Sequence, residues 1–323
     1  MISQNLRYTL LLLILVSLNI AGAVNIRSWK TITNLTDIEE IVLVGNEIWC
    51  ATNGGVLTLD IRTKEFNAIT NTEGLEGINI TCIEYDTRGY IWTALSNGLI
   101  QVYNIETKTW QAYRGFENQT TIHDINIKDG FVLVGFENGL AQLRLDEINR
   151  WELYWIAEIG RVEQVFNDGE HIWLAQDGKV MQNETDYPNL QIPASWTSFP
   201  ANDYFNSESA AVLTFFELNS TIYAGATNGL YQFQADEWIR LGFNDLSVKS
   251  ITVWNNRLSL IAGNGIYAQN EAGEWHAVSN EILDANDLIA DGQNELWVSQ
   301  PGHGLINFSD NAGSLSVENC FPN

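Results

Sequence analysis

The sequence of 323 residues predicts an all-β protein built from one small sheet repeated seven times. Short runs in which apolar and polar residues alternate, as in half-buried strands, are separated by Asp-Gly and Asn-Gly turn signals. A glycine that closes a hairpin recurs at spacings of 36 to 51 residues, at Gly55, Gly98, Gly139, Gly178, Gly229, Gly265 and Gly304. Seven units of about 40 residues with four strands each indicate a seven-bladed β-propeller.

The clearest copy of the unit spans residues 80–113. Its alternating runs predict four strands, at Ile80–Tyr85, Tyr90–Leu95, Leu99–Asn104 and Thr109–Tyr113. Between the second and third strands, Asn97-Gly98 supplies the positive φ that a tight hairpin needs. One such antiparallel sheet cannot bury both of its faces alone, so we expect it to stack against its copies.

Two further positions accompany the repeated glycine. A large apolar residue precedes it by five to seven positions, as Trp49, Trp92, Leu133, Trp173, Tyr223 and Trp297, whereas the sixth copy has Ser259 there. An outer-strand aromatic follows it, as Phe66, Trp110, Trp151, Trp196, Trp238 and Trp275. Each predicted blade then packs only on its two neighbours, which lets a long chain build a stable ring.

Two connections break the regularity of the repeat. From Gly178 to Trp196 the chain takes 18 residues, which is longer than the corresponding stretch in the other copies. The next connection, Pro200–Ser209, carries Tyr204 and Phe205. Long insertions on a rigid scaffold are frequent binding sites, and a tolerated surface insertion is the alternative.

The ends of the chain suggest how the ring closes. The last copy, Leu288–Phe308, shows three strands and lacks the outer aromatic, while Val24–Thr33 contains Trp29-Lys-Thr-Ile, similar to the outer strand at Trp110. We therefore expect the N-terminal strand to close the ring as the outer strand of the seventh blade, which removes an exposed sheet edge. The propeller then covers residues 24–308, and residues 309–323 form a C-terminal tail or linker stub.

The first residues, Met1–Ala23, are typical of a secretory signal peptide. Arg7 is the only charge, Thr9–Ile20 is apolar, and the small residues at 21–23 suit signal peptidase. The apolar run is shorter than the roughly 20 residues that span a bilayer, which favours cleavage over an uncleaved anchor. We expect an exported protein, periplasmic or at the cell surface or extracellular, without stable membrane insertion after cleavage.

Composition narrows the function classes. A formal net charge of −24 without clustered basic residues excludes nucleic acid and anionic membranes as partners. The sequence has no metal, nucleotide or hydrolase motif, so we expect no cofactor, no metal site and no catalytic residues. Three cysteines, Cys50, Cys82 and Cys320, leave at least one thiol unpaired within the chain. A Cys50–Cys82 bridge is an alternative to two small buried hydrophobes.

One stretch is specific enough to suggest a family. Asn71-Thr-Glu-Gly-Leu75, Asn79, the Asp86–Gly89 turn, Ile91-Trp92 and Asn97-Gly-Leu99 resemble the two-component regulator propeller repeat. The resemblance implies either a periplasmic ligand-binding sensor propeller of hybrid histidine kinases or, in PorZ-like proteins, the N-terminal propeller of a type IX secretion component at the cell surface. A single propeller behind a signal peptide is closer in layout to the PorZ-like branch. The chain departs from both branches, because it shows no second propeller, transmembrane helix, kinase or sorting domain.

Propeller geometry places the predicted binding residues at one end of the ring. Connections between blades and second-to-third-strand hairpins share that end, and amide, imidazole and aromatic groups there suit sugar hydroxyls or a peptide backbone. The residues are His123, His303, Tyr204, Phe205, Asn79, Asp124 and Asp287. We expect a non-catalytic recognition or scaffold propeller that binds a cell-envelope protein or an extracellular glycan or peptide. The alternative is a carbohydrate-active enzyme, a lyase or hydrolase, with two carboxylates converging on a groove.

Overall fold

The computed structural model describes residues 33–116, 121–145, 150–280, 282, 284–311 and 314–321. Contacts within the chain divide it into two units, Met1–Ile32 and Thr33–Asn323. The predicted signal peptide, Met1–Ala23, and most of the segment Val24–Thr33 lie outside the described residues. In the part of the chain that is described, no helix is long and apolar enough to cross a membrane.

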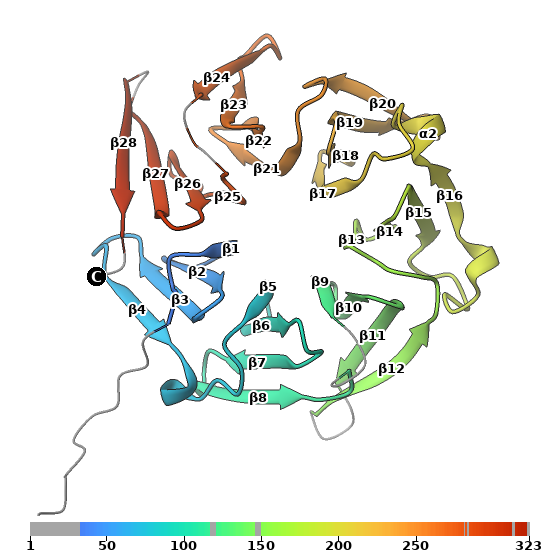
Figure 1. Cartoon of the computed structure of the whole chain (residues 1–323), viewed down its shortest axis with the longest axis horizontal. Coiled ribbons are helices and arrows are strands. Elements are labelled where there is room, and N and C mark those ends of the chain that lie inside the picture. Colours follow the sequence, from blue (N-terminus) through green and yellow to red (C-terminus); the bar gives the residue numbers. More distant parts are fainter. Residues whose placement is uncertain are drawn as a thin grey trace, which may run out of the picture. The chain divides into compact units, whose positions relative to one another are not determined.

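Seven sheets of four antiparallel strands surround a common centre (Figure 1). In every sheet the strands follow one another in chain order, with the first strand nearest the centre and the fourth at the outside (Figure 1). The second unit is therefore a seven-bladed β-propeller, as the repeat predicts.

The first four blades contain sixteen strands. Blade one has β1 (Ile38–Val44), β2 (Glu47–Thr52), β3 (Gly55–Asp60) and β4 (Phe66–Ile69). Blade two has β5 (Ile80–Asp86), β6 (Tyr90–Leu95), β7 (Ile100–Asn104) and β8 (Thr109–Tyr113). Blade three has β9 (Ile122–Lys128), β10 (Phe131–Phe136), β11 (Gly139–Leu145) and β12 (Trp151–Ala157). Blade four has β13 (Gln164–Asn167), β14 (His171–Gln176), β15 (Lys179–Glu184) and β16 (Thr197–Pro200).

The last three blades follow the same order. Blade five has β17 (Val212–Leu218), β18 (Thr221–Ala226), β19 (Gly229–Gln234) and β20 (Glu237–Gly242). Blade six has β21 (Val248–Trp254), β22 (Arg257–Ala262), β23 (Gly265–Gln269) and β24 (Trp275–Ser279). Blade seven has β25 (Leu288–Ala290), β26 (Glu295–Gln300), β27 (Gly304–Asn311) and β28 (Ser314–Cys320). Short helical turns, η1 (Asn71–Glu73), η2 (Pro193–Ser195) and α2 (Ala201–Tyr204), lie in the connections.

The repeated glycine stands where the third strand begins. A Cβ added at Gly55 or Gly139 would collide with the carbonyl oxygen of Ile69 or Ala157, at the end of the fourth strand of the same blade. Only glycine lets the two backbones approach this closely. The requirement arises within one blade, so it repeats with each blade and can be read from the sequence.

The predicted aromatic positions pack neighbouring blades together. Trp92 of β6 lies edge-on to Trp151 of β12, with ring centroids 4.3 Å apart. Trp173 of β14 makes the same kind of contact with Trp238 of β20, at 5.5 Å. In both pairs a second-strand tryptophan meets the outer strand of the next blade, so the core is a set of layers between blades.

The seventh blade closes differently from the prediction. β28 pairs with β27 from Leu305 opposite Cys320 to Asn311 opposite Ser314, and so occupies the outer position that the sequence analysis assigned to Val24–Thr33. The expectation that the N-terminal strand closes the ring and that residues 309–323 lie outside the repeat is wrong. β28 lacks the aromatic residue of the other outer strands, but it follows β27 directly, and a local hairpin costs less loop entropy than pairing with a distant strand.

Blades seven and one meet without sharing a strand among the described residues. Their contact is a buried cluster that includes Ile38, Leu57, Trp297 and Leu305. The backbone N–H of Gly302 donates to the carbonyl oxygen of Thr36 at 2.9 Å. Side-chain packing and hydrogen bonds therefore close the ring. All three cysteines are buried free thiols, so Cys50 and Cys82 are not bridged.

Candidate binding site

The predicted residues have different surroundings in the described part of the chain. His123 is the second residue of β9 and has charged neighbours. Its Nε2 lies 3.0 Å from Glu137 Oε2, and its Nδ1 lies 3.7 Å from Glu163 Oε2. Arg161 pairs with the same Glu163 at 2.7 Å. The imidazole thus lies within a cluster of charged side chains near the start of the inner strand β9.

Asp124 and Asp287 link blades to one another. Asp124 Oδ2 accepts a hydrogen bond of 2.7 Å from the backbone N–H of Val165 in the next blade. Asp287 Oδ2 accepts one of 2.9 Å from Ile41, across the junction of blades seven and one. These contacts account for both carboxylates as inter-blade hydrogen-bond acceptors, a role that needs no ligand.

Four carboxylates from different inner strands interact around the centre of the ring. Burial raises the pKa of Glu84, and together with the negative charges of Asp124, Asp287 and Asp86 it brings this pKa to about 8. Burial also raises the pKa of Asp124 to about 6, against the lowering effect of its backbone hydrogen bonds. Burial and the charges of Asp124 and Asp287 raise the pKa of Glu40. Glu84 can therefore hold its proton near neutral pH. In the described part of the chain, no group of His, Cys, Asp and Glu side chains is arranged to hold a metal ion.

The two aromatic residues of the connection after β16 differ in exposure. Phe205 is only 1% exposed, and its ring packs 4.7 Å from that of Tyr231 in the core. The prediction of Phe205 as a binding residue is therefore wrong, because the turn of α2 points its side chain inward. Tyr204 is partly buried and lies edge-on to Phe199, with ring centroids 5.2 Å apart.

Asn79 and His303, the remaining predicted residues, lie in loops and contact other loop residues. Asn79 is exposed, and its Nδ2 lies 3.4 Å from Ser96 Oγ. His303 is exposed in the hairpin between β26 and β27, and its Nδ1 lies 3.1 Å from the carbonyl oxygen of Pro301. It lines an apolar hollow with Ile282 and Phe308, and no other predicted residue lines that hollow in the described part of the chain.

A better candidate lies between blades three and four, toward the other end of the ring. We call it the blade 3–4 groove: it has a volume of about 460 Å³ and is lined by Phe131, Gln142, Tyr154, Trp155 and residues 185–191. The connection that supplies residues 185–191 is the long one noted in the sequence. It runs for twelve residues between β15 and β16, whereas third and fourth strands are two to five residues apart in the other blades.

Two hydrogen bonds hold this connection in place. Gln191 Nε2 donates to the carbonyl oxygen of Ile156 in β12 at 2.8 Å. Trp196 Nε1 donates to the carbonyl oxygen of Leu190 at 3.0 Å. The repeat's outer aromatic, displaced along the chain in this blade, thus anchors the insertion, and the groove has a fixed wall.

A β-bulge shapes the opposite wall. In the pairing of β11 with β12, Gln142 faces Trp155 and Leu143 faces Leu153, so Tyr154 is the extra residue. Bulges re-aim side chains, and Tyr154 projects outward with 53% of its surface exposed. Nothing in the sequence pattern marks this bulge.

A substitution within the repeat adds space. Leu133 stands where most blades have tryptophan, and it lies directly across the sheet from Gln142. Leucine is much smaller than the tryptophan that fills the corresponding place in blades two and four. The sequence did show this departure, but only the strand register places it beside the groove.

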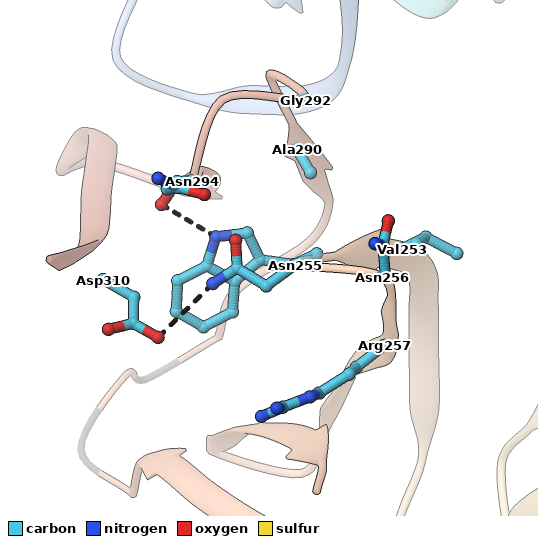
Figure 2. Close-up of a pocket in the computed structure, with 9 residues that line it drawn as sticks. Val253, Asn255, Asn256, Arg257, Ala290, Gly292, Asn294 and Asp310 are labelled. Atoms are coloured by element: carbon cyan, nitrogen blue, oxygen red, sulfur yellow. Dashed lines mark hydrogen bonds between the residues drawn. The ribbon is translucent and has the colours of Figure 1, made fainter. Parts of the chain in front are cut away.

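A second hollow, of about 600 Å³, lies between blades six and seven (Figure 2). Its polar groups are largely paired with one another: the Trp254 indole N–H donates to the carbonyl oxygen of Asn294 at 2.9 Å, and Asn255 Nδ2 donates to Asp310 Oδ2 at 3.4 Å (Figure 2). Arg257, also in the lining, pairs with Glu271 at 3.3 Å. The blade 3–4 groove, with its exposed aromatic rings, is therefore the stronger candidate.

The fold and this groove define the class of the protein: a seven-bladed propeller with a candidate binding groove on its outer wall. No family model and no curated protein matches the sequence. Among solved structures, the chain is similar to PorZ, a bacterial surface component of the type-IX secretion system of Porphyromonas gingivalis, with a TM-score of 0.70 and 16% identity over 90% of this chain and 39% of that chain.

Two other solved structures are similar. The extracellular domain of a hybrid two-component system from B. thetaiotaomicron has a TM-score of 0.63 and 14% identity over 88% of this chain and 45% of that chain. The WD40 propeller domain of Doa1 has a TM-score of 0.66 and 12% identity over 87% of this chain and 96% of that chain. At these identities the similarity shows the propeller fold alone. The chain spans less than half the length of the first two proteins.

Proposed function

We propose that this chain is a non-catalytic recognition propeller, exported to the cell envelope, which binds an envelope protein, glycan or peptide through the blade 3–4 groove. The main support for this proposal is that three departures from the repeat lie at this groove. They are the long connection 185–196, the bulge at Tyr154 and a leucine, Leu133, where most blades have tryptophan. A ring that needed only to be stable would gain nothing from any of them. Rigid scaffolds that carry irregular segments commonly use them for binding.

Placement in the envelope is supported by two lines of argument. The first residues have the pattern of a signal peptide. PorZ is described as a surface component of a secretion system, and another similar structure as an extracellular domain. A role beside a secretion apparatus or in a sensor is the finer form of the proposal, and it rests on this likeness and on the resemblance of the repeat.

The lining of the groove favours recognition over catalysis. Hydrolysis of a glycosidic bond generally needs two carboxyl groups on opposite sides of the bond. Among the described residues that line the groove, Asp186 is the one carboxylate. Glu40, Asp124 and Asp287, whose pKa values are raised, accept hydrogen bonds between blades and do not line the groove.

Capture of envelope material by the full-length chain, expressed with its own leader, tests the proposal. Substituting both exposed tyrosines, Tyr154→Ala with Tyr187→Ala, should reduce the captured material at least about tenfold, because each tenfold loss corresponds to only about 1.4 kcal/mol of contact free energy. The matched control is Ile239→Ala with Leu241→Ala, two exposed apolar residues on the outer strand of blade five. Equal capture by both variants, with unchanged melting temperatures, would overturn the proposal.

A further inference from the structure

The side-chain amide of Gln142 is the unusual group in the groove. Gln142 lies on β11, is only 8% exposed and lines the groove. Its amide has no hydrogen-bond partner among the described residues. The amide atoms are not among the side-chain atoms that are sealed from the surface without a partner, so they are open to the groove. Buried polar groups are nearly always paired in folded proteins, so an unpaired one that faces an opening indicates a partner from outside. A carboxamide has N–H donors and a carbonyl acceptor next to each other. A partner that pairs with both must therefore present an acceptor and a donor next to each other.

We infer that the blade 3–4 groove binds a neutral sugar unit of a glycan, an inference that rests on the proposed function. Neighbouring hydroxyls of a pyranose are each donor and acceptor, and two of them match the N–H and the carbonyl of one carboxamide. This pairing assigns Gln142 as the hydrogen-bonding residue at the base of the groove.

The aromatic walls suit the apolar face of a sugar ring. Tyr154 is 53% exposed and Tyr187 is 37% exposed, and they come from opposite sides of the groove. The guanidinium of Arg144 stacks 4.2 Å from the centre of the Tyr154 ring and so holds the ring in place from one side. Aromatic rings with a polar tip give contact area together with a hydrogen-bonding group, as a sugar requires.

Charge distinguishes neutral from acidic sugars. The described lining has one charged residue, Asp186, and it is negative. The nearby cation, Arg144, forms an ion pair with Glu152, with Nε 2.9 Å from Oε1. With a net charge of −24 over the chain, a carboxylate or sulfate on the ligand would be repelled. The inference therefore excludes uronates and sulfated glycans.

The geometry disfavours a peptide that adds a strand to the blade. Such a peptide would pair with the free edge of β12. At that edge the carbonyl oxygen of Ile156 already accepts a hydrogen bond from Gln191, and the connection 185–191 lies against the strand. A peptide that binds in another way is an outcome of the test.

Calorimetric titration of the full-length chain tests the inference. The probes are cellotetraose, mannotetraose and laminaritetraose as neutral sugars, tetragalacturonate as the acidic one, and a proline-rich peptide. At least one neutral tetrasaccharide should bind. Gln142→Leu should weaken its binding at least about tenfold, because the leucine cannot pair with a hydroxyl. The melting temperature of this variant should not fall, since the amide makes no hydrogen bond within the described part of the chain.

Companion variants separate the ring contact from folding. Tyr154→Ala should weaken binding by a similar factor, whereas Tyr154→Phe should retain most of it because the ring remains. Leu241→Ala should leave binding unchanged. Absence of binding by all three neutral sugars would overturn the inference. If the uronate or the peptide binds instead and depends on Tyr154, the proposed function stands and the sugar assignment fails. If the groove substitutions change the binding of no probe, the sugar assignment fails. The capture experiment then tests the proposed function separately.

Discussion

At the scale of single residues, one position of the inner strand repeatedly connects a blade to the next. Glu40, Asp124, Ser250 and Asp287 occupy corresponding places in their blades, and each accepts a hydrogen bond from a backbone N–H of the following blade, at Ile83, Val165, Leu288 and Ile41. Inner strands of neighbouring blades belong to different sheets, so these N–H groups have no strand partner there. An acidic or hydroxyl side chain supplies the missing acceptor.

The junction of blades seven and one depends on such a hydrogen bond, from Ile41 to Asp287. The substitution Asp287→Ala tests how much this bond stabilises the protein. The carboxylate also accepts hydrogen bonds from Ser250 at 2.6 Å and from the backbone of Leu288 at 2.8 Å. Its removal leaves these donors unpaired, and we expect the free energy of unfolding to fall by about 1–3 kcal/mol. Chemical denaturation would measure the loss. Asp177→Ala, in an exposed turn, is the control, and an equal effect of both substitutions would contradict the structural role.

At the scale of elements, the outer strand is the least regular part of each blade. Blade four reaches its outer strand only after the connection 185–196, and blade seven uses β28, which has no aromatic residue. Outer strands contact the ring on one side only, so they tolerate insertions and changes of sequence better than the inner strands. Variation that leads to binding is therefore expected at the outside, where the blade 3–4 groove lies.

Truncation before β28 tests the closure of blade seven. Cys320 is buried in the cluster shared by blades one and seven, with Trp297 and Leu305. A chain that ends at residue 311 should expose this cluster and the edge of β27, lower the melting temperature by many degrees and aggregate. Thermal unfolding with light scattering would show both effects. A truncated chain that melts like the full one would mean that another segment takes the place of β28.

At the scale of the whole molecule, the ring gathers negative charge at its centre. Glu40, Glu84, Asp124 and Asp287 come from four different blades, and their pKa values are all raised. Burial raises all four pKa values, and the negative charges of neighbouring acids raise those of Glu40 and Glu84 further. Asp124 and Asp287, two of these neighbours, belong to other blades, so their part of the repulsion depends on the closed ring. Protonation of these groups relieves the repulsion, so the stability of the closed ring must depend on pH.

Glu84 allows this dependence to be measured. Its pKa is about 8 in the folded protein and is taken as the ordinary 4.5 in the unfolded chain. As pH rises between these values, the unfolded chain releases the proton while the folded protein keeps it, so the free energy of unfolding falls. We expect the melting temperature to decrease from about pH 5 to about pH 8, and Glu84→Gln to flatten that decrease. Glu106→Gln, on an exposed turn, should keep the original slope; the same slope in both variants would contradict the assignment.

The sequence by itself determined the repeated unit. The strands expected in blade two match β6 and β8 at both ends and β5 and β7 within one residue. The hairpin glycines start the third strand in five blades and precede it by one or two residues in blades four and two. The alternation of apolar and polar residues, the turn residues and the glycine requirement all involve residues that are close in the chain. Interactions of this kind can therefore be predicted from the sequence.

The tertiary structure alone decided which strand closes blade seven, whether an aromatic residue is buried, and what the central carboxylates do. The sequence suggested a surface position for Phe205, which is buried in the core. Asp124 and Asp287, predicted to bind a ligand, accept hydrogen bonds between blades. The groove brings Gln142 and Tyr154 together with residues 185–191, beside Leu133. Which strands pair and how the sheets stack decide these contacts, and a local pattern of residues does not encode either.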